Sequence, residues 1–265
     1  MQTSRHGACF PMASLDLAGV AGRTYKTEAV VLRSIRFSEA DRILHVYTLE
    51  RGRIGAIAKG VRKTKSRFGA RLETLSHVEL MLHEGSGELQ TVTGAALIRS
   101  HHEARDEPYR LEIGLIGAEA MLRLFAEPEA NQKAFTALTR FLDALDEAPI
   151  PAAGRPALDP LALAFQLKLL WVSGYLPHVT SCVECGAAAL VGFSPRAGGA
   201  VCAEHAQGSL GLSPAGLAGI EQLLSAPLAD AHLIELTDRA RRDALSVVTS
   251  SYEEHGGFRL RTLSA

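Results

Sequence analysis

The hydrophobic residues of this 265-residue chain change their spacing once, near residue 103. Before that point, short runs rich in Val, Ile, Leu and Thr alternate apolar with polar residues, as Val78, Leu80 and Leu82 do in "HVELML". A period of two is typical of half-buried strands. Beyond residue 103 the apolar residues recur every three to four positions, which is the period of an amphipathic helix. This change of spacing therefore predicts an α+β protein in which a β domain precedes an all-α domain.

Five strands are expected, at residues 25–34, 42–50, 53–60, 75–84 and 89–100. The glycines of "ERGR" and "EGSGE" supply the positive φ that tight turns need. Five short strands joined by such turns favour a small closed barrel, because closure hides the strand edges. A five-stranded OB-fold barrel over residues 25–103 fits the count, and an SH3-like barrel fits the pattern almost as well.

The helical domain is expected over residues 104–265, with helices in 108–127, 131–147, 161–175, 212–227 and 235–255. The third segment is apolar nearly all round, so we expect it to be the central, buried helix. Ser213 and Pro214 provide an N-cap and a first helical residue for the fourth. These helices are expected to pack as one unit.

Residues 1–24 are interpreted as a flexible leader whose true start is open, with Met12 as an alternative. The segment is a poor secretory signal because Pro11 and Asp16 interrupt its apolar part. No stretch approaches the roughly 18 apolar residues of a membrane helix. We therefore expect a cytoplasmic protein without a membrane partner, whose cysteines stay reduced.

Three of the four cysteines form a cluster with a histidine, C-x2-C-x16-C-x2-H. Pairs with this spacing point two side chains at one tetrahedral ion, so the pattern predicts a zinc-binding knuckle at about residues 180–207. The expected ligands are Cys182, Cys185, Cys202 and His205, and His178 is an alternative to His205. Two pairs of buried thiols are the alternative to a metal. Four protein ligands leave no open position, so the Zn²⁺ is expected to be structural.

Motifs of common catalytic sites are absent from the sequence, including the Walker loop, the G-x-S-x-G elbow and H-E-x-x-H. This absence favours a binding protein over an enzyme. His101 and His102 with Glu103 offer a possible metal site, but a solvated linker is the simpler interpretation. The acidic residues Asp143, Asp146 and Glu147 are interpreted as the polar side of their helix.

The stretch "AKGVRKTKSRFGARLE", residues 58–73, concentrates positive charge in a chain whose net charge is −1. Gly60 and Gly69 bracket it, which would allow a loop that is mobile until a ligand orders it. Phe68 could stack on a base. A solvated loop kept soluble by its charge is the alternative. The candidate DNA contacts are Lys59, Arg62, Lys63, Lys65, Arg67, Phe68 and Arg71, with Arg51 and Arg53 extending the charge to the preceding strand.

The run from residue 28 to 73 resembles the N-terminal domain of the bacterial recombination mediator family RecO. The matching features are "VLR", "SEAD", the pattern T-x-x-x-G-R-x-x-x-x-A-K-G-x-R and "RLETL". The CxxC…CxxH cluster and the closing "GGFRLRTL" resemble the same family, and the resemblance covers residues 25 to about 260.

The resemblance implies an OB-fold domain followed by a helical domain with a zinc knuckle. It implies a non-catalytic protein of DNA repair and homologous recombination that binds single- and double-stranded DNA and anneals complementary strands. It further implies that the protein helps to load RecA onto DNA coated with single-strand-binding protein (SSB). The implied partners are RecR, in some systems RecF, and the C-terminal tail of SSB. Association with the nucleoid is implied as well. A zinc-containing OB-fold RNA-binding protein and an unrecognised hydrolase are the alternatives.

Overall fold

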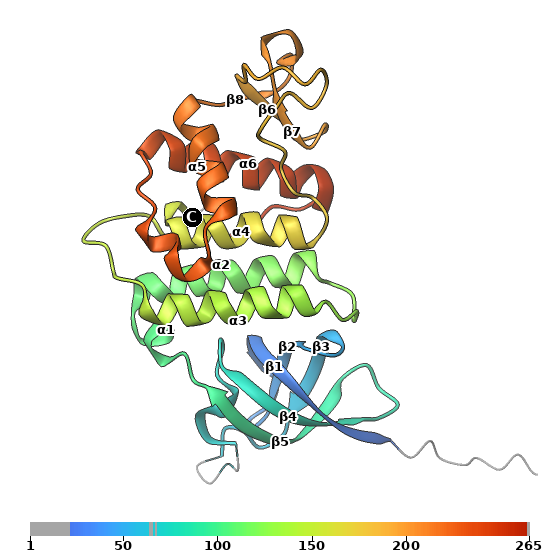
Figure 1. The fold of residues 1–265 in the computed structure, drawn as a ribbon. Helices are drawn as coiled ribbons and strands as arrows, with labels where there is room; N and C mark the ends of the chain where they lie inside the picture. The colour runs from blue at the N-terminus through green and yellow to red at the C-terminus, as the bar shows by residue number, and fades with distance from the viewer. Residues whose placement is uncertain (1–21, 64–65, 67, 264–265) are drawn as a thin grey trace, which may run out of the picture.

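A five-stranded barrel lies at one end of the molecule, the helices lie in layers beside it, and a small three-stranded module lies at the other end (Figure 1). The computed structural model describes residues 22–63, 66 and 68–263. The leader prediction therefore falls outside the described residues up to residue 21, and its last two residues, Arg23 and Thr24, belong to the first strand. The barrel strands are β1 Arg23–Arg36, β2 Arg42–Thr48, β3 Gly52–Ala58, β4 His77–Glu84 and β5 Gln90–Arg99.

The strand order distinguishes the two barrels that the sequence left open. The strands close in the order β1-β2-β3-β5-β4, and β1 pairs with β4 to complete the ring. β5 pairs in parallel with β3 through Ala56–Gln90 and Ile57–Thr91, and antiparallel with β4. A strand inserted between β3 and β4 is a Greek-key feature, so the barrel is of the OB type.

Strand β1 belongs to two cores at once. Ala29 and Val31 point into the barrel, where they pack with Leu44, Val46 and other barrel residues. Val30 and Leu32, on the opposite face of the strand, belong to the core of the helical domain. Because successive side chains of a strand point to opposite faces, a strand between two cores has consecutive buried apolar residues, as in "AVVL".

The helical domain is built around α4, as the sequence predicts. Ten of its side chains are buried, and Asp159 caps its N-terminus by accepting from the Leu161 N–H. Ser213 caps α5 in the same way, by accepting from the Gly216 N–H. The helices are α1 His102–Asp106, α2 Pro108–Leu124, α3 Gln132–Glu147, α4 Pro160–Val172, α5 Pro214–Ser225 and α6 Asp238–Gly256. The 3-10 helices are η1 Gly69–Leu72, η2 Pro156–Leu158, η3 Ala203–His205 and η4 Leu228–Leu233.

The closing segment of the chain returns to α2. The carboxylate of Glu119 accepts hydrogen bonds from the backbone N–H groups of Arg261 and Thr262, at 3.1 and 3.0 Å. Leu260 and Leu263 are buried in the helical core. These contacts explain why "GGFRLRTL" is an ordered part of the helical domain.

The join between barrel and helices is a buried contact, so the prediction of a solvated linker at His101 is wrong. The φ angle of His101 is 48°, and this left-handed turn directs its ring inward, where 1% of the residue is exposed. Its Nδ1 lies 2.8 Å from Oδ2 of Asp146, and Oδ1 of Asp146 accepts from the N–H of Ala104 at 3.0 Å. Asp146 is therefore a structural partner and not a member of a solvated face.

The other polar residues near the join differ in their roles. Asp143 pairs with Arg99 at 2.9 Å, which gives the barrel and α3 a second polar contact. His102 and Glu103 are exposed and pair with each other at 3.3 Å. Glu147 is exposed, as predicted. None of the described helices has the length and apolar character needed to cross a bilayer.

Candidate nucleic-acid interface and metal centre

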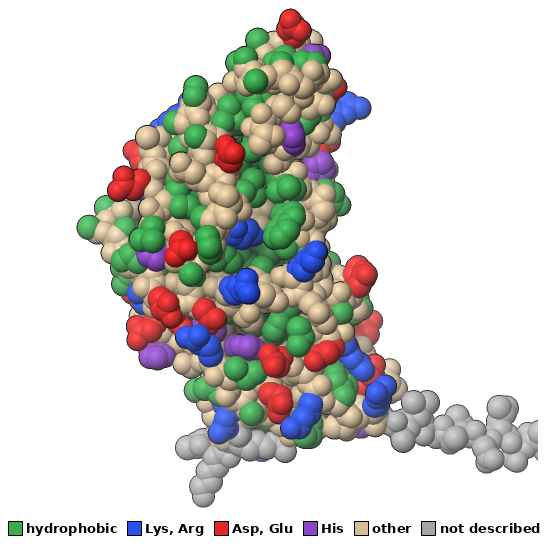
Figure 2. Space-filling view, viewed as in Figure 1, with side chains coloured by type: hydrophobic (Ala, Val, Ile, Leu, Met, Phe, Trp, Pro, Cys, Tyr) green, Lys and Arg blue, Asp and Glu red, His purple; other side chains and the backbone are tan. Residues whose placement is uncertain are grey.

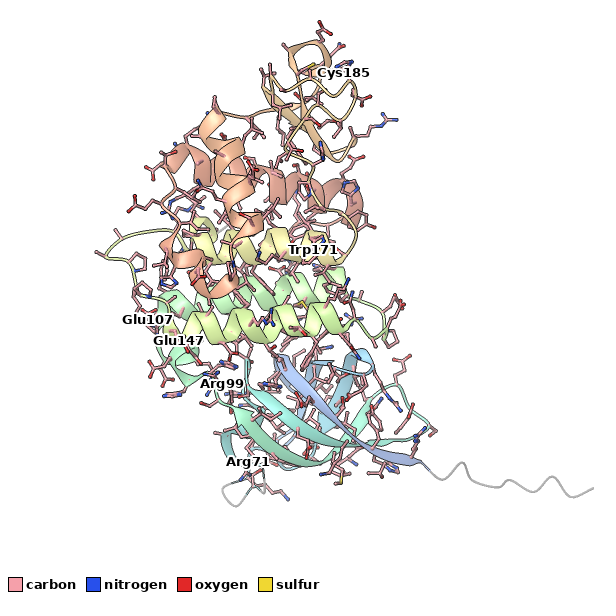
Figure 3. All side chains as sticks on the ribbon, in the orientation of Figure 1. Arg71, Arg99, Glu107, Glu147, Trp171 and Cys185 are labelled. Carbon is pink, nitrogen blue, oxygen red and sulfur yellow. The ribbon has the colours of Figure 1, made fainter. Side chains whose placement is uncertain are left out.

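The basic loop, residues 59–73, connects β3 to β4 and includes η1. Figure 3 shows Arg71 of this loop at the lower end of the molecule and Cys185 of the cysteine cluster at the opposite end. The two candidate sites are therefore separate surfaces, and a metal at the cluster makes no contact with a ligand that is confined to the basic loop.

The first turn of the basic loop is fixed to the loop between β1 and β2. Gly60, with φ of 67°, donates its N–H to Oδ1 of Asp41 at 2.7 Å. Arg62 donates its backbone N–H to the carbonyl of Ala40 and its Nη1 to the carbonyl of Glu39, both at 3.0 Å. Residues 59–63 therefore form a turn that is hydrogen-bonded to the β1–β2 loop.

Four predicted DNA contacts of the loop are exposed on this turn and on η1: Lys59, Arg62, Lys63 and Arg71. Lys65 and Arg67 lie outside the described residues. The nearby acid Glu73 pairs with Arg42 at 3.2 Å, and Asp41 accepts the Gly60 N–H, so both carboxylates are engaged beside the loop. The described part of the loop presents a surface with an excess of positive charge.

Phe68 is a core residue, and the prediction that its ring stacks on a base is wrong for this structure. The residue is 1% exposed and packs in the barrel core together with Leu72, the last residue of η1. An aromatic side chain in a charged loop can insert into the barrel because burying its ring removes a large apolar area from water. Phe68 therefore anchors the basic loop to the barrel core.

The two arginines of β3 and its preceding turn have internal partners. Arg51 pairs with Glu84 at 3.0 Å, and its guanidinium lies 3.8 Å from the centre of the Tyr25 ring. Arg53 donates to the carbonyl of Leu122 on α2 at 3.4 Å. Both charges are engaged in the structure, so Arg51 and Arg53 add less to an anion-binding surface than their place beside the basic stretch suggests.

Strand pairing adds one exposed cation that the sequence analysis missed. Arg36, the last residue of β1, is exposed and lies opposite Arg42 on β2. The β1–β2 loop that follows it is the one to which Arg62 is bonded. Arg36 is more than twenty residues from the basic loop in the chain, and only the barrel topology shows that the β1–β2 loop after Arg36 is bonded to the basic loop.

The cysteine cluster is assembled by the three-stranded module, in which β6 Gly192–Ser194 pairs with β7 Gly199–Val201 and β8 Leu210–Gly211. The ligand atoms of Cys182, Cys185, Cys202 and His205 all lie within 4.8 Å of one another. Cys185 Sγ and Cys202 Sγ are 3.8 Å apart, and Cys202 Sγ and His205 Nδ1 are 3.3 Å apart. A tetrahedral ion with bonds of about 2.0–2.3 Å needs ligand separations of about this size, so the residues fit a metal ion.

His178 lies outside this cluster. Its Nε2 is 2.8 Å from the hydroxyl of Ser181, and its backbone pairs with the strand segment around Gly199. The geometry thus brings His205 and not His178 to the three thiols. His178 instead belongs to the segment that connects α4 to the module, and its backbone pairs with Gly199 of β7.

Two of the three thiols, Cys182 and Cys202, have a lowered pKa, whereas at Cys185 the hydrogen bond from the Ala187 backbone is outweighed by the contact with the Cys182 thiol and by burial, which raise the pKa. Burial raises the pKa of Cys182, but the backbone N–H groups of Cys202, Glu184 and Cys185 outweigh it and bring the pKa down to about 6. The hydrogen bond with His205 lowers the pKa of Cys202, and that same contact raises the pKa of His205. Since the thiolate is the form that binds metal, this environment favours binding.

The fold and the two sites define a class of protein: an OB-type barrel with a basic loop, joined to a helical domain that carries a Cys₃His cluster. The family model described as "Recombination protein O N terminal" matches residues 23–101, and "Recombination protein O C terminal" matches residues 105–264. The chain belongs to the RecO family.

Curated relatives agree over most of their length. The chain is 37% identical to the DNA repair protein RecO of Rubrobacter xylanophilus over 214 residues, which is 78% of this chain and 83% of the relative. It is 33% identical to the DNA repair protein RecO of Anaeromyxobacter sp. (strain K) over 243 residues, 89% of this chain and 92% of the relative. The family supports a role in DNA repair and recombination.

Proposed function

We propose that the protein is a non-catalytic mediator of homologous recombination that binds single- and double-stranded DNA, anneals complementary strands and helps to load RecA onto SSB-coated DNA. RecR, and in some systems RecF, are the proposed partners, and the proposed location is the cytoplasm, at the nucleoid. Residues 25–103 and 104–265 are the proposed domains. Membership of the RecO family supports this function.

The observation that carries the proposal is the fixed basic turn at one end of the barrel. Lys59, Arg62 and Lys63 are exposed on a turn whose backbone is already bonded to the β1–β2 loop. A preordered cationic surface loses little conformational entropy when phosphates bind to it. Contacts of this kind hold the backbone and read no sequence, so two strands can share the surface while their base edges remain free to pair.

The proposed cofactor is a structural Zn²⁺ bound by Cys182, Cys185, Cys202 and His205. Three thiolates and one imidazole suit zinc better than the oxygen-preferring Mg²⁺ or Ca²⁺. The apolar cluster of the module has only three buried members, Cys182, Val201 and Cys202, and two of these are ligands. Phe193 of β6 is buried in the helical core, and a bound metal would add the stability that the module's own small cluster lacks.

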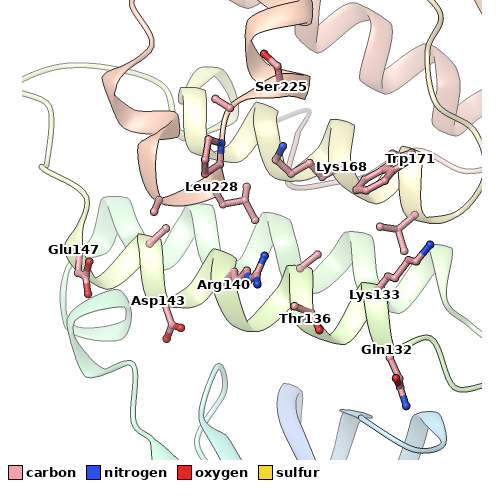
Figure 4. Close-up of a pocket in the computed structure, with 16 residues that line it drawn as sticks. Gln132, Lys133, Thr136, Arg140, Asp143, Glu147, Lys168, Trp171, Ser225 and Leu228 are labelled. Carbon is pink, nitrogen blue, oxygen red and sulfur yellow. The ribbon is translucent and has the colours of Figure 1, made fainter.

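The proposed site for the SSB tail is a cavity of about 890 Å³ between α3, the end of α4 and the start of η4. Figure 4 shows Lys133, Arg140 and Lys168 around it, with Trp171 at one end and Glu147 at the other. Asp143, on its rim, is paired with Arg99. Apolar walls with three cations fit an acidic peptide that also carries bulky apolar side chains.

The experiment that tests the function is annealing of complementary DNA strands coated with SSB, measured with and without the protein. Annealing should be accelerated by the wild-type protein and much less by Lys59→Ala/Lys63→Ala. The same assay with complementary RNA strands addresses the alternative of an RNA-binding protein. Acceleration confined to RNA, or absent from both, would contradict the proposal.

A further inference from the structure

The tail cavity continues into a second cavity of about 450 Å³ on the other side of Trp171. Lys168, Trp171 and Ser225 line both. Trp171 lies in the last turn of α4, and 54% of the residue is exposed (Figure 3). In the face shown in Figure 2, hydrophobic side chains gather across the middle of the molecule, with Lys and Arg side chains along the margin nearer the barrel. Because they share these three lining residues, the two cavities form one groove.

The second cavity differs from the first in its chemistry. Its apolar lining residues include Trp171, Leu176, Val179 and Leu224, and its charged residues are Lys168 and Glu221, whereas the first cavity has three cations and the acids Asp143 and Glu147. Lys133 and Arg140 line only the first cavity. An acidic peptide would therefore place its carboxylates in the first cavity and a bulky apolar side chain in the second.

One wall of the second cavity is the segment 176–180, and the three-stranded module holds this segment by strand pairing. The N–H of His178 donates to the carbonyl of Gly198 at 3.1 Å, and the N–H of Ala200 donates to the carbonyl of His178 at 2.7 Å. The approach is close: a Cβ on Gly199 would lie 2.7 Å from the His178 oxygen.

The strand that holds this wall ends at a metal ligand. β7 ends at Val201, and Cys202 follows it directly. The N–H of Val183, one residue after Cys182, donates to the carbonyl of Ala200 at 3.0 Å. A bound metal would crosslink Cys182 and Cys202, the residues that flank this hydrogen bond, whereas Phe193 of β6 is buried in the helical core with or without it. Loss of that crosslink would loosen β7 and weaken its hold on His178.

The geometry points to a metal at the Cys₃His cluster as the factor that controls how tightly a peptide binds in this groove. The metal would act through β7, which holds the His178 wall of the second cavity in place. The inference rests on the proposed function, since the occupant is the acidic peptide assigned there to the first cavity. With metal bound, the second cavity is formed and takes the bulky apolar end of the peptide. Without metal, the wall is released and that contact is lost, while the carboxylate contacts remain.

The test uses a fluorescein-labelled peptide of three aspartates, a leucine and a C-terminal phenylalanine, with a matched peptide that ends in serine. Zinc-loaded wild-type protein should bind the phenylalanine peptide more tightly. Metal removal with a chelator, or Cys185→Ser, should weaken that binding about tenfold or more, the size expected for one bulky apolar side chain. Binding of the serine peptide should not change. Hydrogen exchange at the amides of His178 and Ala200 should become faster.

The metal-free protein could lose peptide binding simply because it unfolds. A variant of the cavity wall that still binds the metal is therefore the control. Leu176→Ser should weaken binding of the phenylalanine peptide, and Leu233→Ser, at a residue 67% exposed on η4, should not. Unchanged affinity for the phenylalanine peptide after metal loss, or in Leu176→Ser, would overturn the inference and leave the proposed function intact. A peptide that fails to bind even the zinc-loaded protein would contradict the inference and the tail site of the proposed function together.

Discussion

Nδ1 of His101 lies 2.8 Å from Oδ2 of Asp146, and this contact joins the end of the barrel to α3. The His101 side chain is fully buried, and that of Asp146 is 14% exposed. The backbone of His101 occupies the left-handed region at the same point, with φ of 48°. A strained residue persists only where its surroundings hold it, and here the Asp146 carboxylate does so.

Asp146→Asn should destabilise the protein by about 2 kcal/mol at pH 7, because a charge-assisted hydrogen bond to a buried ring is lost. Urea unfolding measures the change. Glu147→Gln, at the exposed neighbouring position, is the control and should be neutral. A variant Asp146→Asn as stable as the wild type would contradict the structural role of this pair.

The same pair predicts a pH dependence. Burial raises the pKa of Asp146, but the hydrogen bond with His101 and further contacts outweigh it, so the folded pKa lies below its ordinary 3.8. A depressed carboxyl pKa stabilises the fold above the unfolded value, and this contribution is lost as the pH falls through the folded pKa. Asp146→Asn should therefore lose less stability than the wild type below about pH 4, as measured by urea unfolding across that range.

Phe68→Ala should destabilise the barrel by about 3–5 kcal/mol, since it removes a buried ring from a packed core. Phe68→Leu should cost about 1 kcal/mol and keep DNA affinity, because it retains most of the apolar volume. Unfolding curves and DNA titrations of both variants distinguish a core-packing role of Phe68 from a role in stacking on a base. A stable Phe68→Leu protein with greatly weakened DNA binding would restore the base-stacking role.

His205→Ala should lose most of its zinc, whereas His178→Ala should retain about one equivalent, because a tetrahedral structural site needs all four of its ligands. Metal analysis of the two purified variants provides the measurement. Limited proteolysis should cut the module of the His205 variant and leave the barrel intact. Full zinc content in His205→Ala would show that another residue supplies the fourth ligand.

Local sequence patterns predicted the elements that depend on neighbouring residues. The alternation in "HVELML" gave β4, the all-round apolar character of residues 161–175 gave the central helix α4, and the cysteine spacing gave four ligands within 4.8 Å. Each of these features depends on residues close in the chain or on a spacing that one ion imposes.

The predictions that were wrong concern contacts between residues far apart in the chain. Phe68 lies among charges and shows no periodicity of its own, so only the closed barrel reveals that its ring is in the core. His101 and Asp146 are 45 residues apart, and a His-His pair in a polar stretch gives no sign that one ring is buried. Arg36 is placed beside Arg42 by strand pairing, which the sequence alone does not show.

The most direct test of the central claim, that the basic loop holds DNA through its phosphates, is the salt dependence of single-stranded DNA binding. Lys59→Ala/Lys63→Ala is compared with the wild type and with Lys133→Ala/Arg140→Ala, which removes the same charge from the tail cavity. Each lost phosphate contact should reduce the slope of log K against log salt by about 0.7. We predict a weaker affinity and a slope smaller by about 1.4 for the loop variant, and no change for the cavity variant. An unchanged slope and affinity in Lys59→Ala/Lys63→Ala would contradict the account.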